Sequence, residues 1–183
     1  MRKVFLIAGL MTAFVLATLA SSAAANFAGT WKLDKEKSQG LSQGMMNAES
    51  VIWTITQDDK TISIDSKVVA GQPPAGGAPP GGPGGGRGPG GGALGPRTFN
   101  LDGKETSTEA VGGNIVATKA TSSTDGKTLE LRTTRSGNSN GVEYKLGLTD
   151  KLQLSGDGKV LTVNRHSDGP RGIQDSTLVF NKQ

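Results

Sequence analysis

The sequence of 183 residues contains no cysteine and a single histidine, His166. Without cysteine, no disulfide can hold the fold together and no lipid can be attached through a thioether. One histidine excludes histidine-rich zinc sites and the usual zinc protease motif. A Ser-His-Asp triad lacks support as well, because no Gly-x-Ser-x-Gly turn accompanies His166. The sequence therefore predicts a protein that is not an enzyme and that has no metal site and no cofactor.

Aromatic residues are scarce, at 4% of the chain, and neither sign of charge dominates. The formal net charge is +4, with lysine and arginine interspersed among aspartate and glutamate. Proteins that bind nucleic acid usually combine clustered basic residues with aromatic side chains that stack on bases. We therefore expect no nucleic-acid partner.

The only long apolar run lies at the start of the chain, between Val4 and Ala20. It follows a basic start and precedes the small residues Ala23–Ala25, which together predict a cleavable secretory signal over residues 1–25. A retained membrane anchor is the alternative, but the run is short for a transmembrane helix. We expect a mature chain of residues 26–183 that does not span the membrane and is periplasmic or secreted. The lack of cysteine favours a bacterial periplasm.

Residues 71–96 differ in kind from the rest, because 20 of these 26 residues are glycine or proline. Such a segment buries too little apolar surface to offset the entropy of ordering it. Glycine does not recur at every third position, which excludes a collagen-like helix. The sequence predicts a disordered insertion within a single domain, either as a spacer or contact arm or as a tolerated low-complexity loop.

Apolar and polar residues alternate with a period of two along most of the mature chain. The clearest stretch extends from Val142 to Leu154, where only Asp150 interrupts the apolar face. Asp-Gly pairs at 102–103, 125–126 and 157–158 favour tight turns between antiparallel neighbours. No helical period is present. We predict an all-β fold, an antiparallel up-and-down meander of about 8–10 strands that closes into a barrel, since closure removes exposed strand edges.

The mature chain begins with Asn26-Phe27-Ala28-Gly29-Thr30-Trp31-Lys32-Leu33. With this stretch it resembles the lipocalin-like proteins of the calycin superfamily, and in particular small exported bacterial proteins that open on Asp/Asn-Phe-x-Gly-Thr-Trp-Lys-Leu. Further matches are Lys37-Ser38, Arg165-His166 and Thr177–Phe180. The second lipocalin motif, Thr-Asp-Tyr, is missing, because Lys151 follows Thr149-Asp150.

The resemblance implies a structural motif formed by Gly29, Trp31 and Arg165. In lipocalins the motif tryptophan closes the base of the barrel and packs under a basic side chain from a late strand. Arg165 is the predicted partner of Trp31, through a cation–π contact.

The resemblance also implies an exported lipocalin-like binding protein that holds a small apolar ligand in the barrel or at its mouth. The same inward residues would serve a barrel filled by side chains alone. A non-catalytic envelope interaction or inhibitor protein with a packed core is therefore the alternative. The candidate ligand-binding residues are Trp53, Ile62, Ile64, Phe99, Leu129, Leu131, Tyr144, Leu146, Leu148 and Leu152.

Overall fold

The computed structural model describes residues 25–71, 96–110, 113–139, 141–170 and 172–183. The expected signal peptide and the expected Gly/Pro-rich insertion lie almost wholly outside the described residues. Both stay predictions.

The described chain is almost entirely β-structure, as predicted. One short helix, α1, is the exception. The elements in order are β1 (Gly29–Leu33), α1 (Gln43–Asn47), β2 (Ala48–Gln57), β3 (Thr61–Ala70), β4 (Arg97–Asn100), β5 (Thr106–Ala110), β6 (Asn114–Ser122), β7 (Thr128–Ser139), β8 (Val142–Leu154), β9 (Val160–Gly169) and β10 (Gly172–Lys182).

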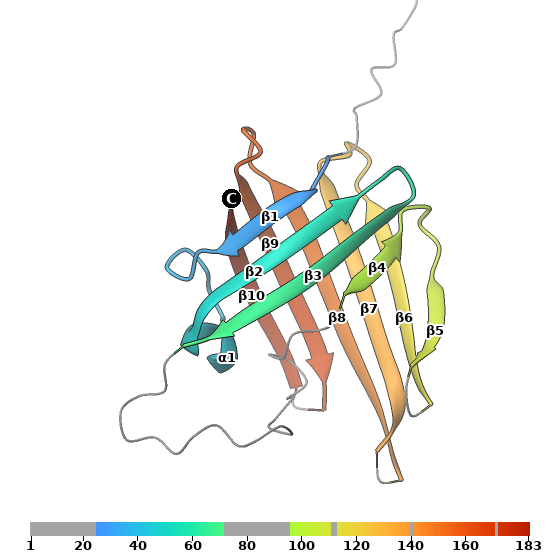
Figure 1. Cartoon of the computed structure of the whole chain (residues 1–183). Helices are drawn as coiled ribbons and strands as arrows, with labels where there is room; N and C mark the ends of the chain where they lie inside the picture. Colours follow the sequence, from blue (N-terminus) through green and yellow to red (C-terminus); the bar gives the residue numbers. More distant parts are fainter. Residues whose placement is uncertain (1–24, 72–95, 111–112, 140, 171) are drawn as a thin grey trace, which may run out of the picture.

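The strands form one 10-stranded antiparallel sheet in the order β4-β3-β2-β1-β10-β9-β8-β7-β6-β5. The first strand of the chain, β1, pairs with both β2 and the last strand, β10. The sheet curls into a nearly closed barrel (Figure 1). Strands β4 and β5 are the two ends of this order. Near them, Asn100 Nδ2 of β4 donates a hydrogen bond to Thr106 Oγ1 of β5 at 2.8 Å. The predicted fold class is confirmed.

One local prediction differs from the structure. The sequence shows no helical period, yet the connection after β1 contains α1, which is only five residues long and too short for such a period to stand out. Its Met45 is buried in the core, whereas Met46 is 53% exposed.

Trp31 pairs with Lys182, and the adjacent Asn181 pairs with Val160 at the start of β9, so Trp31 lies toward the end of the barrel that carries the β8–β9 turn. This is the upper end in Figure 1. Its side chain is fully buried, and its Nε1 donates to the backbone oxygen of Phe27 at 3.0 Å. The cation above its ring is Lys182, with Nζ 5.3 Å from the ring centroid. The predicted partner, Arg165, lies over Trp53 instead, with Cζ 5.4 Å from that ring. The prediction of an Arg165–Trp31 pair is therefore wrong.

Burial along the inner face divides the barrel into two halves. Around Trp31 the inward side chains are packed and inaccessible to water, and we name this half the closed end. Beyond Asp150 on β8 the inward positions become half-buried and finally exposed, as at Val142. We name this half, which carries the β7–β8 hairpin, the open end. The core is thus concentrated on one side of the barrel's middle.

Replacing Leu161 with alanine is expected to lower the free energy of unfolding by about 2 to 5 kcal/mol, since this fully buried side chain of the closed end would leave a cavity. Val142→Ala is the control at the open end. Its side chain is 68% exposed, and the expected change is within about 0.5 kcal/mol. Urea denaturation measures both. Equal losses would contradict the division of the barrel into two halves.

Candidate functional site

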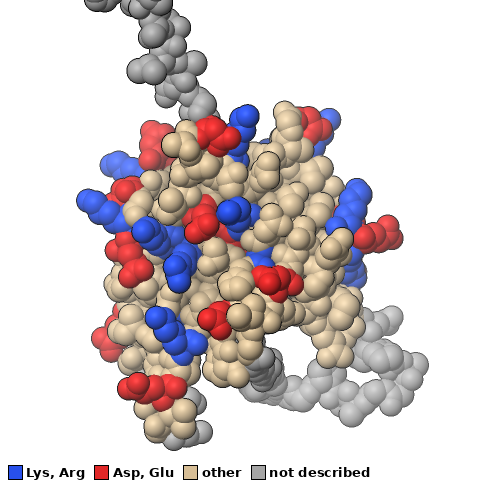
Figure 2. All heavy atoms as spheres, turned by 180° about the vertical axis from the view of Figure 1, so that it is seen from behind, with Lys and Arg blue, Asp and Glu red and all other residues tan. Residues whose placement is uncertain are grey.

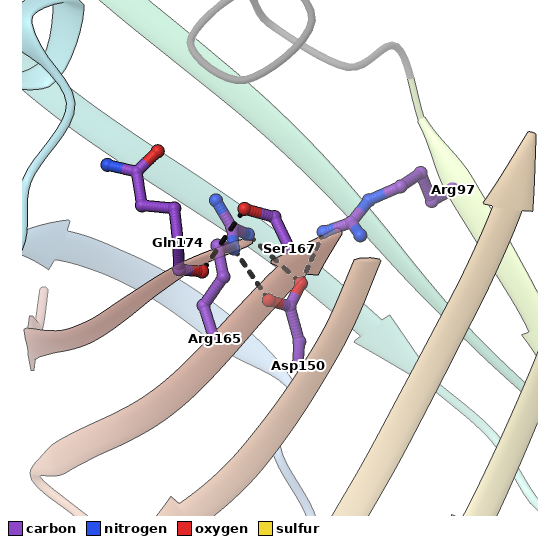
Figure 3. Close-up of polar contacts among 5 residues, drawn as sticks. All are labelled: Arg97, Asp150, Arg165, Ser167 and Gln174. Atoms are coloured by element: carbon purple, nitrogen blue, oxygen red, sulfur yellow. Dashed lines mark hydrogen bonds and ion pairs between the residues drawn. The ribbon is translucent and has the colours of Figure 1, made fainter. Parts of the chain in front are cut away.

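A buried carboxylate lies in the middle of the barrel, with an arginine on either side of it (Figure 3). Asp150 is completely inaccessible to solvent. Arg165 binds it through two hydrogen bonds, from Nε to Oδ1 at 2.6 Å and from Nη2 to Oδ2 at 3.0 Å. Arg97 Nη2 donates to Oδ2 at 3.0 Å. These three side chains form what we name the ion cluster.

The strand period explains how the chain brings these residues together. Asp150 shares its phase with the inward Leu148 and Leu152 of β8, so its side chain must also point inward. Arg165 is its register partner on β9. Arg97 opens β4, near the far end of the sheet order, and in Figure 3 it approaches Asp150 from the side opposite Arg165. The cluster therefore spans the barrel.

Burial and charge act in opposite directions on Asp150. Burial alone would raise the pKa of this carboxyl, but the positive charges of Arg165 and Arg97 and their hydrogen bonds hold it below its ordinary value of 3.8. Burial, together with repulsion from Arg165, lowers the pKa of Arg97 despite the attraction of Asp150. Asp150 is thus a stable anion between two cations, and the cluster has a net charge of about +1 at neutral pH.

Two buried polar atoms close to this cluster have no hydrogen-bond partner among the residues that the structure describes. They are Nη1 of Arg97 and Oγ1 of Thr133. The Arg97 side chain is only 9% exposed, so little water reaches it. A buried polar group left unpaired costs about 1 to 3 kcal/mol, and more when it is charged. The hydrogen-bonding capacity of the buried polar groups in this part of the barrel is therefore only partly used.

The predicted ligand-binding residues fall into two groups. The larger group is fully buried in the packed core and offers no accessible surface: Trp53, Ile62, Ile64, Phe99, Leu129, Leu131 and Leu152. The smaller group, Tyr144, Leu146 and Leu148, lies along the inward phase of β8 at the open end and is half-buried. The structure does not bring the ten residues together as one accessible surface.

Sequence reasoning recognised Asp150 as the one break in an apolar face but assigned it no role. It missed Arg97 entirely. A lone acidic residue on an inward phase is a usable signal, because such a residue requires a buried cation. Arg97 gives no comparable signal, since it directly follows the Gly/Pro-rich segment and begins a strand of only four residues.

A hollow of about 530 Å³ lies on the outer face of the barrel under Gln39 and Gly40. It contains a pair formed by His166 Nδ1 and Asp175 Oδ1 at 2.7 Å, with side chains 50% and 74% exposed. Figure 2 shows one outer face on which side chains of both charge signs are interspersed. The exposure of the His166–Asp175 pair is typical of a solvated surface contact.

Two further kinds of feature are absent from the described residues. No three histidine, aspartate or glutamate side chains there are grouped closely enough to hold a metal ion. Within that same part of the chain, no helix is both long and apolar enough to cross a membrane.

Comparison with known proteins adds little to the strand pairing described above. No protein-family model and no curated protein matches the chain. Among solved structures, the zebrafish ileal bile acid-binding protein in complex with cholic acid is similar, with 14% sequence identity and a TM-score of 0.45, over 86% of this chain and 98% of that chain. Cholic acid is bound by the zebrafish protein, and this observation concerns that protein alone. The fold assigned above depends only on this chain's own strand pairing.

Asp150→Asn is expected to destabilise the protein by about 3 to 5 kcal/mol at pH 7, because two buried guanidinium groups lose the charge that compensates them. The folded-state pKa of Asp150 is lowered, so its stabilising effect is complete above the ordinary value of 3.8 and is lost as the pH falls through the lowered value. The difference in stability between wild type and variant should therefore shrink below pH 3.8. Urea denaturation across a pH series measures it.

Asp175→Asn is the matched control, since this carboxylate is 74% exposed on the outer face and should contribute little at any pH. If the difference in free energy of unfolding between the wild type and Asp150→Asn stays constant down to pH 2.5, the assignment of a lowered pKa to Asp150 is wrong.

Proposed function

We propose that the protein is an exported binding barrel that takes up a small apolar ligand at its open end. The observation that carries this proposal is the half-burial of Tyr144, Leu146 and Leu148 on the inner face of β8. Inward apolar side chains that a folded barrel leaves partly accessible can gain about 25 cal/mol for each Å² that a ligand covers. The packed closed end lies on the other side of the ion cluster from this surface.

The backbone beside Leu146 leaves room for its side chain. A Cβ atom at Gly169 of the neighbouring strand β9 would lie 2.7 Å from Leu146 Cδ2, so glycine at this position leaves the space that the leucine occupies. Gly169 itself is the register partner of Gly172, at the start of β10. Leu146 therefore packs closely against the β9 backbone at the inner edge of the open end.

The alternative is a non-catalytic envelope interaction or inhibitor protein, and one observation favours it. Most of the predicted ligand-binding residues, including Trp53 and Phe99, are fully buried in the core. A barrel that needed no ligand would be packed in the same way at its closed end. The two functions differ at the open end alone, which is where the experiment is directed.

The purified protein is expected to bind a neutral apolar fluorescent dye such as Nile red. Leu146→Asn should weaken this binding about tenfold, because a polar side chain replaces apolar contact area in the proposed site. Fluorescence titration of the dye measures the dissociation constants.

Ile173→Asn is the matched control. Ile173 is also apolar and near the open end, but it belongs to the outward phase of β10 and is 67% exposed. Its substitution should leave dye binding unchanged. Absence of dye binding by the wild type, or equal weakening by both variants, would overturn the proposal and favour the interaction protein.

Export is tested separately by the mass of the protein in bacterial periplasmic extracts. We expect a chain that begins at Asn26, because residues 1–25 have the organisation of a cleavable signal. Intact-mass spectrometry identifies the first residue. A full-length chain retained in the membrane fraction would contradict the proposal of export.

A further inference from the structure

We propose that Arg97 Nη1 and Thr133 Oγ1 form a subsite for a single negatively charged head group, so that the ligand is an amphiphile with one anionic end and an apolar tail. This inference rests on the proposed function and specifies the chemical class of its ligand. The ligand would enter head first, with its anion beside the ion cluster and its tail along Tyr144, Leu146 and Leu148.

Charge is the first argument. Two guanidinium groups, with side chains 9% and 13% exposed, share one buried carboxylate, which leaves a net charge of about +1. Placing one more negative charge there compensates the cluster, whereas a neutral head group would leave it as it is. A monoanion matches this excess, and a doubly charged group would exceed it.

Hydrogen bonding is the second and independent argument. Arg97 uses Nη2 for Asp150, while Nη1 has no partner among the described residues. An arginine nitrogen of this kind can only donate, so its natural partner is an acceptor such as a carboxylate oxygen. The Thr133 hydroxyl, likewise unpaired, can donate to the same group.

Register places the unpaired Thr133 on the open-end side of Asp150. Leu131 of β7 is paired with Asp150, and Thr133 is paired with Leu148, so Thr133 is the diagonal neighbour of Asp150 toward the open end. Leu148 is one of the residues proposed to contact the apolar tail. Head-group and tail contacts are therefore adjacent.

Aromatic rings indicate from which side the anion approaches. The Arg165 guanidinium lies over Trp53, with Cζ 5.4 Å from the ring, and Arg97 Cζ lies 5.9 Å from the ring of Phe99. Both rings are fully buried in the core. The aromatic layer occupies the closed-end side of the cluster, which leaves the open-end side for a ligand.

The experiment compares two ligands of equal tail length, decanoate and decanol, by displacement of Nile red at pH 7. The wild type should bind decanoate about 10- to 100-fold more tightly than decanol, as expected for hydrogen bonds between a buried cation and an anion. Arg97→Met should abolish this preference. Asp150 keeps Arg165 as its partner, but the guanidinium group that carries the unpaired Nη1 is removed. Thr133→Val, which is nearly isosteric, should reduce the preference several-fold and carries the test if Arg97→Met does not fold.

Arg132→Met is the matched control, since it removes one arginine from the exposed outward phase of β7 and should leave the preference intact. Equal binding of decanoate and decanol by the wild type would overturn the anion subsite while leaving the binding barrel standing. A preference that survives in both Arg97→Met and Thr133→Val would overturn it as well. Failure of both compounds to displace the dye would overturn the inference and the proposed function together.

Discussion

A carboxylate that must remain charged in the middle of the barrel is the constraint on which the rest of the structure depends. Asp150 has no access to water, so its charge is tolerable only if cations surround it. Arg165 comes from the adjacent strand β9, but Arg97 comes from β4, near the far end of the sheet order. The ion cluster thereby ties the short β4 to the wall formed by β8 and β9, near the place where the sheet leaves the barrel incompletely closed.

The ion cluster also separates two kinds of interior. On its closed-end side, Trp53 packs against Phe180 with ring centroids 4.6 Å apart, and the surrounding side chains exclude water. On its open-end side, the inward positions of β8 lose burial progressively toward the hairpin. Stability and accessibility are therefore assigned to different halves of one sheet. Changes at the open end can alter its accessible apolar surface without removing the packing that holds the barrel together.

The sequence was sufficient to predict the fold, because alternation with a period of two and Asp-Gly turns are local signals that each strand carries by itself. It was insufficient for contacts that depend on the barrel's closure. Lys182 and Arg165 are both cations of the last two strands, and only the register between β1 and β10 decides that Lys182 lies over Trp31. The position of Arg97 opposite Asp150 likewise follows from how the sheet curls, which no local pattern encodes.

Stability alone does not account for an ion cluster that contains one arginine more than its carboxylate can neutralise. Buried ion pairs can often be replaced by apolar side chains of similar volume at no cost in stability. Selection for packing alone would favour replacement of Arg97 by an apolar residue, because its unpaired Nη1 carries a desolvation penalty and makes no hydrogen bond in return. The anion subsite proposed above would explain the second arginine, since a bound anion would complete the cluster and the accessible apolar side chains beside it would contact that anion's tail.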